Sequence, residues 1–422
     1  MLQVSYIRDN REQVLERLAV KNFKQPQLVD EIIELDLEYK EVDSKLQQTR
    51  GRLNELAKRI GEFKKAGIEP PNELLIDNTF LKNDEKDFDI RLDRLQTELD
   101  AKVVLLPNLP HISVPTGKSA DDNQEIFKHE LYPILPVNAK PHWELASKYN
   151  LIDFELGVKI TGAGFPVYKG KGAKLQRALI AFFLDEAENE GYKEFMLPLM
   201  VNTESGFGTG QLPDKEGQMY YVGNDELYLI PTAEVPITNM YRDVFLKNEQ
   251  LPIKACGYTP CFRREAGSYG SDVRGLNRLH QFDKVEIVQI VKPELSYIAH
   301  EKMCLHVQNL LEKLELPFRI LRLCGGDMSF ASALTHDFET WSAAQKKWLE
   351  VSSVSNFETF QSHRLKLRYK NEKGKNEFAH TLNGSALALP RIVATLLENN
   401  QTEKGIKVPE VLVPYTKFEW ID

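Results

Sequence analysis

The fold is decided by residues 257–286, which read GYTPCFRREAGSYGSDVRGLNRLHQFDKVE. An extended run enters this stretch, and a segment rich in Gly and Ser, which also carries Arg274 and Arg278, turns the chain. A second extended run then leaves through Val291. Two β-like runs joined by turn-forming residues predict an antiparallel hairpin with a long loop.

The hairpin brings several kinds of chemistry to one side. Side chains alternate along a strand, so we expect Arg263 and Glu265 on one face of the first strand, and Phe282 and Glu286 on one face of the second. A cation, two carboxylates and an aromatic ring could then surround a ligand. The alternative is an exposed, ion-paired sheet face, which is common on soluble proteins.

A second candidate site lies near the end of the chain, where NGSALALPR spans 383–391 and leads into a helix that runs to Asn399. Small residues allow close backbone approach, and a helix start that carries Arg391 suits an anion. Arg391 and Arg263 would then form a pair of arginines, which is what two phosphates of one nucleotide would need. The commonest nucleotide motifs, GxxxxGK[ST] and a strand–GxGxxG–helix unit, are missing.

A helix is expected over 174–190, because Leu175, Leu179 and Phe182 recur at helical spacing before Gly191. The following run EFMLP ends at Pro198, which cannot donate to a strand ladder and belongs at a sheet edge or an interface.

The N-terminal region predicts two long helices. Apolar residues repeat at alternating spacings of four and three from Leu28 to Phe63, and a similar repeat runs from Leu74 to Leu106. The intervening GIEPP at 67–71 stops the first helix. We therefore expect helices at about 28–66 and 72–106 that fold back as an antiparallel coiled coil.

Charge is unevenly distributed along the first of these helices. Residues 28–43 hold seven acids and one lysine, whereas residues 44–66 hold seven basic residues and two acids. Such a basic tip could bind phosphates. It is equally compatible with the charged, solvated flank of any coiled coil.

Composition limits the remaining possibilities. The 422 residues are 42% hydrophobic and 27% charged with a net charge of -8, so the chain is globular and any nucleic-acid footprint must be local. The four cysteines lack CxxC spacing, which argues against structural zinc and against a disulfide framework. No signal peptide or membrane span is apparent, so the expected location is the cytoplasm. The Pro- and Asn-rich segment 107–139 predicts a linker, and the main body begins at 140.

In their order and spacing, these segments resemble the class II aminoacyl-tRNA synthetases, and in particular the bacterial seryl-tRNA synthetases over essentially the whole chain. The helix that ends at Pro198 is similar to motif 1, the segment from Phe262 to Phe282 to motif 2, and 383–391 to motif 3. The resemblance implies an α+β fold, in which an antiparallel sheet flanked by helices follows an N-terminal two-helix arm. It also implies a tRNA-binding domain over 1–106 and a catalytic domain over 140–422.

The resemblance further implies an enzyme of protein biosynthesis that joins serine and ATP into seryl-adenylate and passes serine to the 3′ end of tRNA(Ser), and also of tRNA(Sec). No covalent enzyme intermediate is needed, so catalysis would come from positioning and from charge stabilisation by Arg263 and Arg391. The ATP-binding residues would be Arg263, Arg264, Glu265, Phe282, Glu350, Val351, Ser352, Ser353 and Arg391. Within this set, Glu350 and Ser353 would hold Mg²⁺.

Serine would be recognised by Thr232, Ala233, Glu234, Arg263, Glu286, Asn383 and Ser385. A carboxylate that awaits a hydroxyl rejects alanine, because alanine would leave it unpaired. The resemblance assigns tRNA contacts to Arg50, Arg52, Lys58 and Arg59, and it implies a two-fold homodimer.

The sequence departs from the commoner family pattern at Arg264, Leu334, His336, Ala386 and Pro390. A lone histidine is more often structural than catalytic, which favours a structural role for His336. Three other functions stay open: a ligase that loads a carrier protein, a non-catalytic binding relative, and a coiled-coil scaffold. The first has no need of the long helical hairpin, the second is expected to lose Arg263 or Arg391, and the third leaves 257–286 unexplained.

Overall fold

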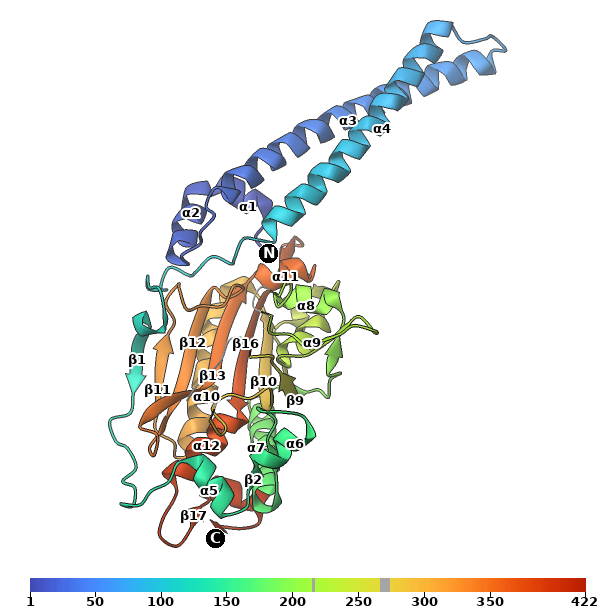
Figure 1. The fold of residues 1–422 in the computed structure, drawn as a ribbon. Coiled ribbons are helices and arrows are strands. Elements are labelled where there is room, and N and C mark those ends of the chain that lie inside the picture. Colours follow the sequence, from blue (N-terminus) through green and yellow to red (C-terminus); the bar gives the residue numbers. More distant parts are fainter. Residues whose placement is uncertain (215–216, 266–273) are drawn as a thin grey trace. The chain divides into compact units, whose positions relative to one another are not determined.

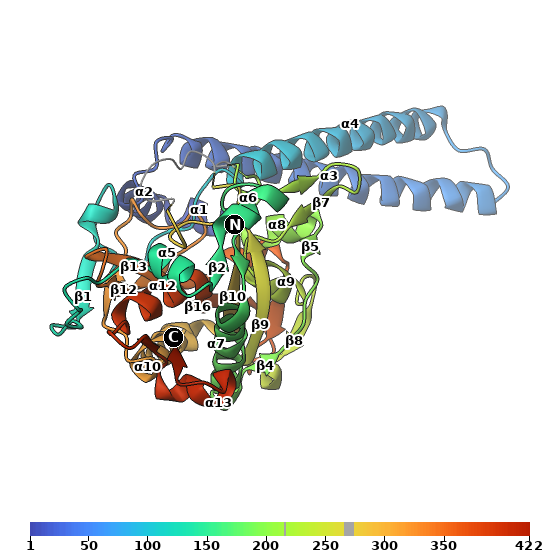
Figure 2. The same ribbon diagram turned by 60° about the horizontal axis from the view of Figure 1, so that its bottom comes forward.

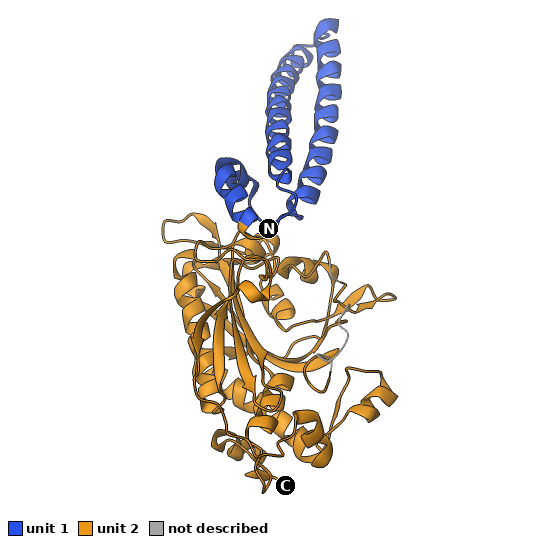
Figure 3. Ribbon diagram, turned by 60° about the vertical axis from the view of Figure 1, so that its left-hand side comes forward, with its two compact units in different colours: residues 1–19, 23–107 blue, residues 20–22, 108–422 orange. Residues whose placement is uncertain are grey.

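The computed structural model describes residues 1–214, 217–265 and 274–422. The chain divides into two compact units (Figure 3). Unit 1 comprises Met1–Ala19 and Phe23–Pro107, and unit 2 comprises Val20–Asn22 and Asn108–Asp422.

Unit 1 contains the predicted pair of long helices, α3 (Leu28–Lys65) and α4 (Asn72–Val103), which follow α1 (Val4–Asp9) and α2 (Arg11–Val20). The heptad residues pack between them in two clusters, one built around Leu46 and Leu95 and the other around Leu56 and Leu81. The expectation of a two-helix arm is confirmed. The second helix ends at Val103 rather than 106, ahead of Pro107, whose ring disfavours helical geometry in the residue before it.

Unit 2 is built on an eight-stranded sheet in the order β1-β11-β12-β13-β16-β10-β9-β4 (Figure 1). All neighbouring strands are antiparallel except β4 and β9, which are parallel. The strands are β1 (Gln124–Lys128), β4 (Lys193–Glu194), β9 (Ile253–Phe262), β10 (Gln281–Val291), β11 (Phe318–Arg322), β12 (Leu334–Ser342), β13 (Lys347–Glu358) and β16 (His380–Ala388). The expected α+β fold with an antiparallel sheet is confirmed.

The main core lies on one face of this sheet. Three helices cover that face: α7 (Gly170–Asn189), α10 (Ser296–Lys313) and α12 (Leu389–Asn399) (Figure 2). Val285 and Ile287 of β10 point into this core. The even-numbered Phe282, Lys284 and Glu286 of the same strand line a cavity on the other face. Strand alternation thus separates the core from the site.

The segment 107–139, for which the sequence predicts a linker, contributes β1 to the edge of the sheet, where it pairs with β11. The pattern missed this strand because every side chain of β1 is exposed, so no apolar alternation marks it.

The remaining elements complete unit 2. The helices are α5 (His142–Lys148), α6 (Phe154–Ile160), α8 (Thr203–Thr209), α9 (Glu234–Asn239), α11 (Phe360–Arg364) and α13 (Val413–Thr416). The short strands are β2 (Ile152–Asp153), β3 (Val167–Tyr168), β5 (Met200–Val201), β6 (Tyr221–Val222), β7 (Leu227–Leu229), β8 (Phe245–Lys247), β14 (Arg368–Lys370), β15 (Asn376–Phe378), β17 (Ile406–Lys407) and β18 (Trp420–Ile421). Within the described ranges, no helix has the length and apolar character needed to cross a bilayer.

Candidate active site

A cavity of about 640 Å³ opens on the face of the sheet opposite the main core. The predicted site residues that line it are Thr232, Glu234, Arg263, Glu265, Phe282, Glu286, Glu350, Val351, Ser352, Ser353, Asn383, Ser385 and Arg391. Two predicted residues do not line it. Ala233 is buried in an apolar cluster with Ile237 and Val288, and Arg264 is exposed.

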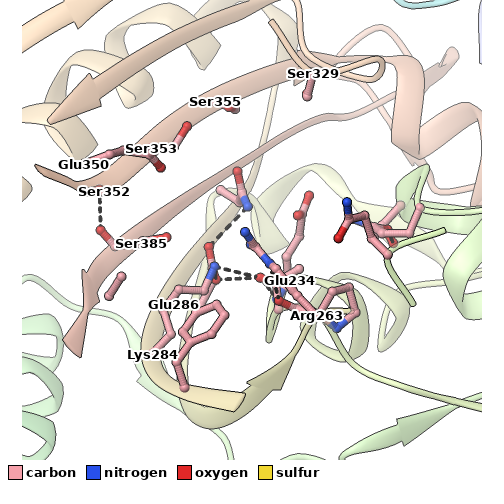
Figure 4. Close-up of a pocket in the computed structure, with 18 of the residues that line it drawn as sticks. Glu234, Arg263, Lys284, Glu286, Ser329, Glu350, Ser352, Ser353, Ser355 and Ser385 are labelled. Atoms are coloured by element: carbon pink, nitrogen blue, oxygen red, sulfur yellow. Dashed lines mark hydrogen bonds and ion pairs between the residues drawn. The ribbon is translucent and has the colours of Figure 1, made fainter. Parts of the chain in front are cut away.

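Glu286 forms the centre of a polar network at one end of the cavity (Figure 4). Its side chain is fully buried, and its Oε2 accepts a hydrogen bond of 2.6 Å from Thr232 Oγ1. Asn383 Nδ2 donates to its Oε1 at 3.2 Å, and Lys284 forms an ion pair with the carboxylate. Ser385 is its direct partner across β10 and β16. Buried charge is tolerated here because each oxygen has a donor.

Lys284 was not among the site residues predicted from the sequence, although the strand pattern contains a signal for it. Period two along β10 places it on the same face as Phe282 and Glu286. Its ammonium group also donates to Thr232 Oγ1 at 3.1 Å, so it joins the two serine-site candidates.

Glu234 lies at the start of α9 and is also buried. Its Oε1 accepts a hydrogen bond of 2.6 Å from Gln361 Nε2. Burial, followed by the nearby charge of Glu286, raises the pKa of Glu234 to about 7. A cation at this end of the cavity would therefore be attracted by two carboxylates that repel each other.

Arg263 enters the cavity from the end of β9. The strand stops at Phe262, so the expectation that Arg263 and Glu265 share a strand face is wrong, and Glu265 has a left-handed φ of 48°. Arg263 N donates to His280 O at 2.9 Å, which holds the two sides of the hairpin together beyond the strands. The guanidinium carbon lies 5.3 Å from the centre of the Phe282 ring.

Glu265 forms an ion pair of 3.1 Å with Arg278 on the return side of the loop. The Gly- and Ser-rich part of the predicted loop, 266–273, lies outside the described residues.

Arg391 stands at the far end of the site in the first turn of α12. Its Nη1 donates to the backbone oxygen of Glu350 at 2.7 Å, and its Nε donates to the backbone oxygen of Asn277 at 3.1 Å. The Glu350 carboxylate is 3.5 Å away. The guanidinium is thus fixed by residues of both β13 and the hairpin loop.

The surroundings of Glu350 and Ser353 fit a cation. Asp337 is opposite Ser353 in the β12–β13 register. Burial and the neighbouring Glu350 raise the pKa of Asp337 well above its usual range, and its Oδ1 has no partner among the described residues. An oxygen-rich corner of this kind suits Mg²⁺, and a bound cation would favour the ionised form of Asp337. Asp337 was not predicted from the sequence, because the local sequence pattern does not reveal which strand pairs with β13.

His336 lies away from the cavity, in a buried cluster with His300 and Cys304. Arg322 Nε donates to His336 Nε2 at 3.3 Å, so the proton of this neutral ring is on Nδ1, which faces Cys304 Sγ at 3.9 Å. Cys304 Sγ is 4.0 Å from His300 Nδ1, and His300 Nε2 donates to Val354 O at 3.1 Å. The cluster is a directed chain of hydrogen bonds.

A metal ion does not suit this chain of hydrogen bonds, because it would meet the Nδ1 proton of His336 and the charge of Arg322. Burial also keeps the groups neutral, since it lowers the pKa of His300 to about 4 and of His336 to about 3, and raises that of Cys304 to about 12. His300 and Cys304 are four residues apart on α10, and this spacing could have predicted their proximity. No such local pattern predicts that His336 lies beside them.

The predicted tRNA contacts in unit 1 are of two kinds. Arg50 is engaged across the helix pair, where it forms ion pairs of 2.9 Å with Glu85 and 3.0 Å with Asp89. Arg52, Lys58 and Arg59 are exposed on α3. Of the four predicted contacts, Arg50 is thus partly neutralised by α4, whereas the other three present their charge to solvent.

Two family comparisons cover most of the chain. Residues 1–110 match the seryl-tRNA synthetase N-terminal domain. Residues 220–400 match the tRNA synthetase class II core domain (G, H, P, S and T).

Relatives resemble the chain over its full length. A serine–tRNA ligase of Salinibacter ruber is 49% identical over 421 residues, which cover 99% of this chain and 98% of that protein. One from Chlorobaculum parvum is 46% identical and covers both chains completely. The crystal structure of seryl-tRNA synthetase from Pyrococcus horikoshii complexed with ATP has a TM-score of 0.94 at 34% identity, with 100% of this chain and 99% of that chain covered.

Proposed function

The chain belongs to the class II seryl-tRNA synthetases and is a serine–tRNA ligase, and from this premise we propose how its own residues carry out the reaction. The observation that carries the proposal is that one cavity holds both a buried carboxylate pair, Glu234 and Glu286, and two arginines, Arg263 and Arg391. The first pair suits an amino acid with a hydroxyl group, and the second suits a polyphosphate.

Serine binds at the end of the cavity around Glu286. The α-ammonium group of serine pairs with Glu234 close to Thr232, and the hydroxyl donates to Glu286 beside Ser385 and Asn383. Lys284 is already paired with Glu286, so the serine hydroxyl enters an existing network rather than creating a new buried charge. Alanine lacks the hydroxyl and so cannot add this hydrogen bond, and sites that hydrogen-bond a substrate hydroxyl reject the analogue without it by roughly 10⁴-fold.

ATP lies along the remaining length of the cavity. Adenine stacks on Phe282 with its amino group near Glu265, Arg263 holds the α-phosphate, and Arg391 holds the γ-phosphate. The serine carboxylate attacks the α-phosphorus, pyrophosphate leaves, and the arginines stabilise the charge that develops on the phosphate oxygens. Ser352 holds β13 and β16 together at this surface, because its hydroxyl donates to Ser385 O at 2.5 Å.

Glu350 and Ser353 would hold Mg²⁺ with the help of Asp337, whose Oδ1 has no partner among the described residues and whose raised pKa a nearby cation would lower. The ion would neutralise phosphate charge when it is bound.

The second step transfers serine from the adenylate to the 3′ end of tRNA(Ser), and we extend this to tRNA(Sec). The segment 1–106 acts as the tRNA-binding domain, 107–139 connects it, and 140–422 is catalytic. Arg52, Lys58 and Arg59 supply the phosphate contacts on α3. Residues 72–89 of α4 hold six acids and two lysines, and two of the acids pair with Arg50, so the basic excess belongs to α3. The cytoplasm, where tRNA is used, is the expected location.

A two-fold dimer would cover the exposed apolar side chains that follow α7. Met196 is 96% exposed, and Leu199, Met200 and Tyr221 are exposed as well. Isolated apolar side chains are normal on a surface, but a group of this kind suits a partner surface. A second copy of this chain supplies the same patch, as a two-fold interface requires.

The decisive experiment measures serine-dependent ATP–pyrophosphate exchange, followed by transfer of labelled serine to tRNA(Ser) and to tRNA(Sec) transcripts. Exchange with serine but not alanine, followed by transfer to both, is the expected result. Exchange without any transfer would favour a ligase for another acceptor, and transfer to tRNA(Ser) alone would limit the acceptor range.

A further inference from the structure

His142, the first residue of α5, lies at a buried junction of three segments. Its side chain is fully buried. Nε2 accepts a hydrogen bond of 2.8 Å from the backbone N–H of Leu276, and Nδ1 donates to Glu398 Oε1 at 2.7 Å. A backbone amide can only donate, so Nε2 carries no proton and the ring is the neutral Nδ1–H tautomer.

Glu398 anchors this ring to α12. Its carboxylate also accepts hydrogen bonds from Ser342 Oγ, from Gln345 Nε2 at 3.0 Å and from the backbone N–H of His142 at 3.0 Å. Burial would raise the pKa of Glu398, but the hydrogen bonds from His142 and Ser342 outweigh it and lower this pKa. Glu398 is therefore an ionised carboxylate that accepts four hydrogen bonds, and it lies about two turns along α12 from Arg391.

The loop before β10 sits directly on His142 and Trp143. Gly275 has a φ of +68°, and a Cβ added there would lie 2.3 Å from His142 Nε2 and 3.1 Å from Trp143 Cε3. The Arg274 guanidinium carbon lies 4.8 Å from the centre of the Trp143 ring. A glycine is thus required at 275 both by its backbone and by the closeness of α5.

Asn277, the residue after Leu276, connects the position of this loop to the cavity. Its backbone oxygen accepts from Arg391 Nε at 3.1 Å, and its Nδ2 donates to Gln345 Oε1 at 3.0 Å. Leu276 and Asn277 both line the cavity beside Arg391. One imidazole therefore fixes the loop against the helix that carries Arg391.

We propose that His142 is a positioning residue for ATP, which holds the carbonyl of Asn277 where it orients the Arg391 guanidinium. The inference rests on the proposed role of Arg391 in ATP binding. His142 acts on the polyphosphate end of the cavity and not on the serine end, because none of its hydrogen bonds reaches Thr232, Glu234 or Glu286.

A pair of substitutions separates the two hydrogen bonds of the ring. In His142→Asn, the amide nitrogen stays near the Nδ1 position and can donate to Glu398, but nothing accepts from Leu276 N–H. In His142→Gln, the longer side chain brings an amide oxygen to the Nε2 position. The measurements are KM for ATP and for serine in pyrophosphate exchange with the full-length enzyme, together with the thermal melting midpoint.

We expect His142→Asn to raise KM for ATP by about 10- to 100-fold, because a displacement near 1 Å of a positioning group has effects of this size. KM for serine should stay within twofold, and His142→Gln should recover most of the ATP effect. His306→Asn on α10 is the matched control, a buried histidine whose Nε2 has no partner among the described residues. It should alter neither KM.

Three results would overturn the inference: an unchanged KM for ATP in His142→Asn, no recovery in His142→Gln, or equal increases in both KM values with a lower melting midpoint. Gly275→Ala provides a second approach that leaves Glu398 intact, and it should also raise KM for ATP selectively. Arg391→Ala tests the premise. If Arg391→Ala binds ATP normally, the proposed function of Arg391 is wrong. If Arg391→Ala binds ATP poorly but the His142 variants bind it normally, the positioning role of His142 is wrong.

Discussion

Thr232 Oγ1 donates a hydrogen bond of 2.6 Å to Glu286 Oε2, and this contact joins the segment before α9 to a central strand of the sheet. The same hydroxyl accepts from Lys284 Nζ and from the backbone N–H of Glu234, at 3.1 and 3.2 Å. One threonine therefore connects the three charged residues at the serine end of the cavity. Its geometry is set before any ligand arrives, which reduces the cost of ordering the site on binding.

Thr232→Val keeps the volume of this side chain and removes its hydroxyl. We expect KM for serine to rise by roughly tenfold, because a hydrogen bond to a charged group contributes about 1.5–3 kcal/mol. KM for ATP should be unchanged, and Thr232→Ser should restore the serine value. If Thr232→Val and Thr232→Ser behave alike in exchange assays, the hydroxyl has no role in serine binding.

Arg263→Ala should lower the rate of pyrophosphate exchange by about 10²–10³-fold, because the charge that it meets develops in the transition state. Serine binding, measured by calorimetry, should be affected much less. Arg368→Ala is a suitable control, since Arg368 is an exposed arginine on the separate sheet formed by β8, β14 and β15. Near-normal exchange in Arg263→Ala would refute its assignment to the α-phosphate.

Serine binding should depend on pH through Glu234, whose pKa is raised to about 7. Below that pH the carboxyl group is protonated and cannot pair with the ammonium group of serine, so kcat/KM for serine should fall as pH decreases from 8 to 6. The folded-state pKa exceeds the ordinary value of 4.5, so ligand-free stability should decline as pH rises from 4.5 to about 7, where only the folded protein keeps the proton. Glu234→Gln should abolish both trends and raise the melting midpoint at pH 8.

The triple variant of Arg52, Lys58 and Arg59 to Ala should weaken tRNA binding and flatten its dependence on salt, with each lost phosphate contact removing roughly one unit or less of slope. Serine activation should be unaffected. Arg50→Ala should behave differently, because its ion pairs with Glu85 and Asp89 hold α3 to α4, and it should lower the melting midpoint of the arm. Unchanged tRNA affinity in the triple variant would mean that this face of α3 is only solvated.

Light scattering should give twice the 48.4 kDa mass of one chain at micromolar concentration. Met196→Arg places a charge on the most exposed of the apolar side chains near Pro198 and should shift the protein toward the monomer. Ile112→Arg is the control, because Ile112 is a similarly exposed apolar residue outside this group. Equal masses for both variants and the unmodified protein would argue against this patch as the interface.

Parts of the site were predictable because they depend on local periodicity. The alternation along 281–286 places Phe282 and Glu286 on one face of β10. The same reasoning failed for Arg263 and Glu265, since the chain leaves the strand at Phe262 and Glu265 adopts a left-handed conformation. Strand ends depend on tertiary contacts such as the hydrogen bond from Arg263 N to His280 O, and local patterns do not contain them.

By itself the sequence determined the two long helices of unit 1, the hairpin around the site and the residue types that the cavity uses, because heptads, strand alternation and turn residues act over a few neighbouring positions. Only the tertiary structure decided which distant residues meet. His142 and Glu398 are 256 positions apart, and Thr232 and Glu286 are 54 apart. Their contacts depend on the order and register of strands and on the helices packed against them, and those follow from burying one shared core rather than from any single segment.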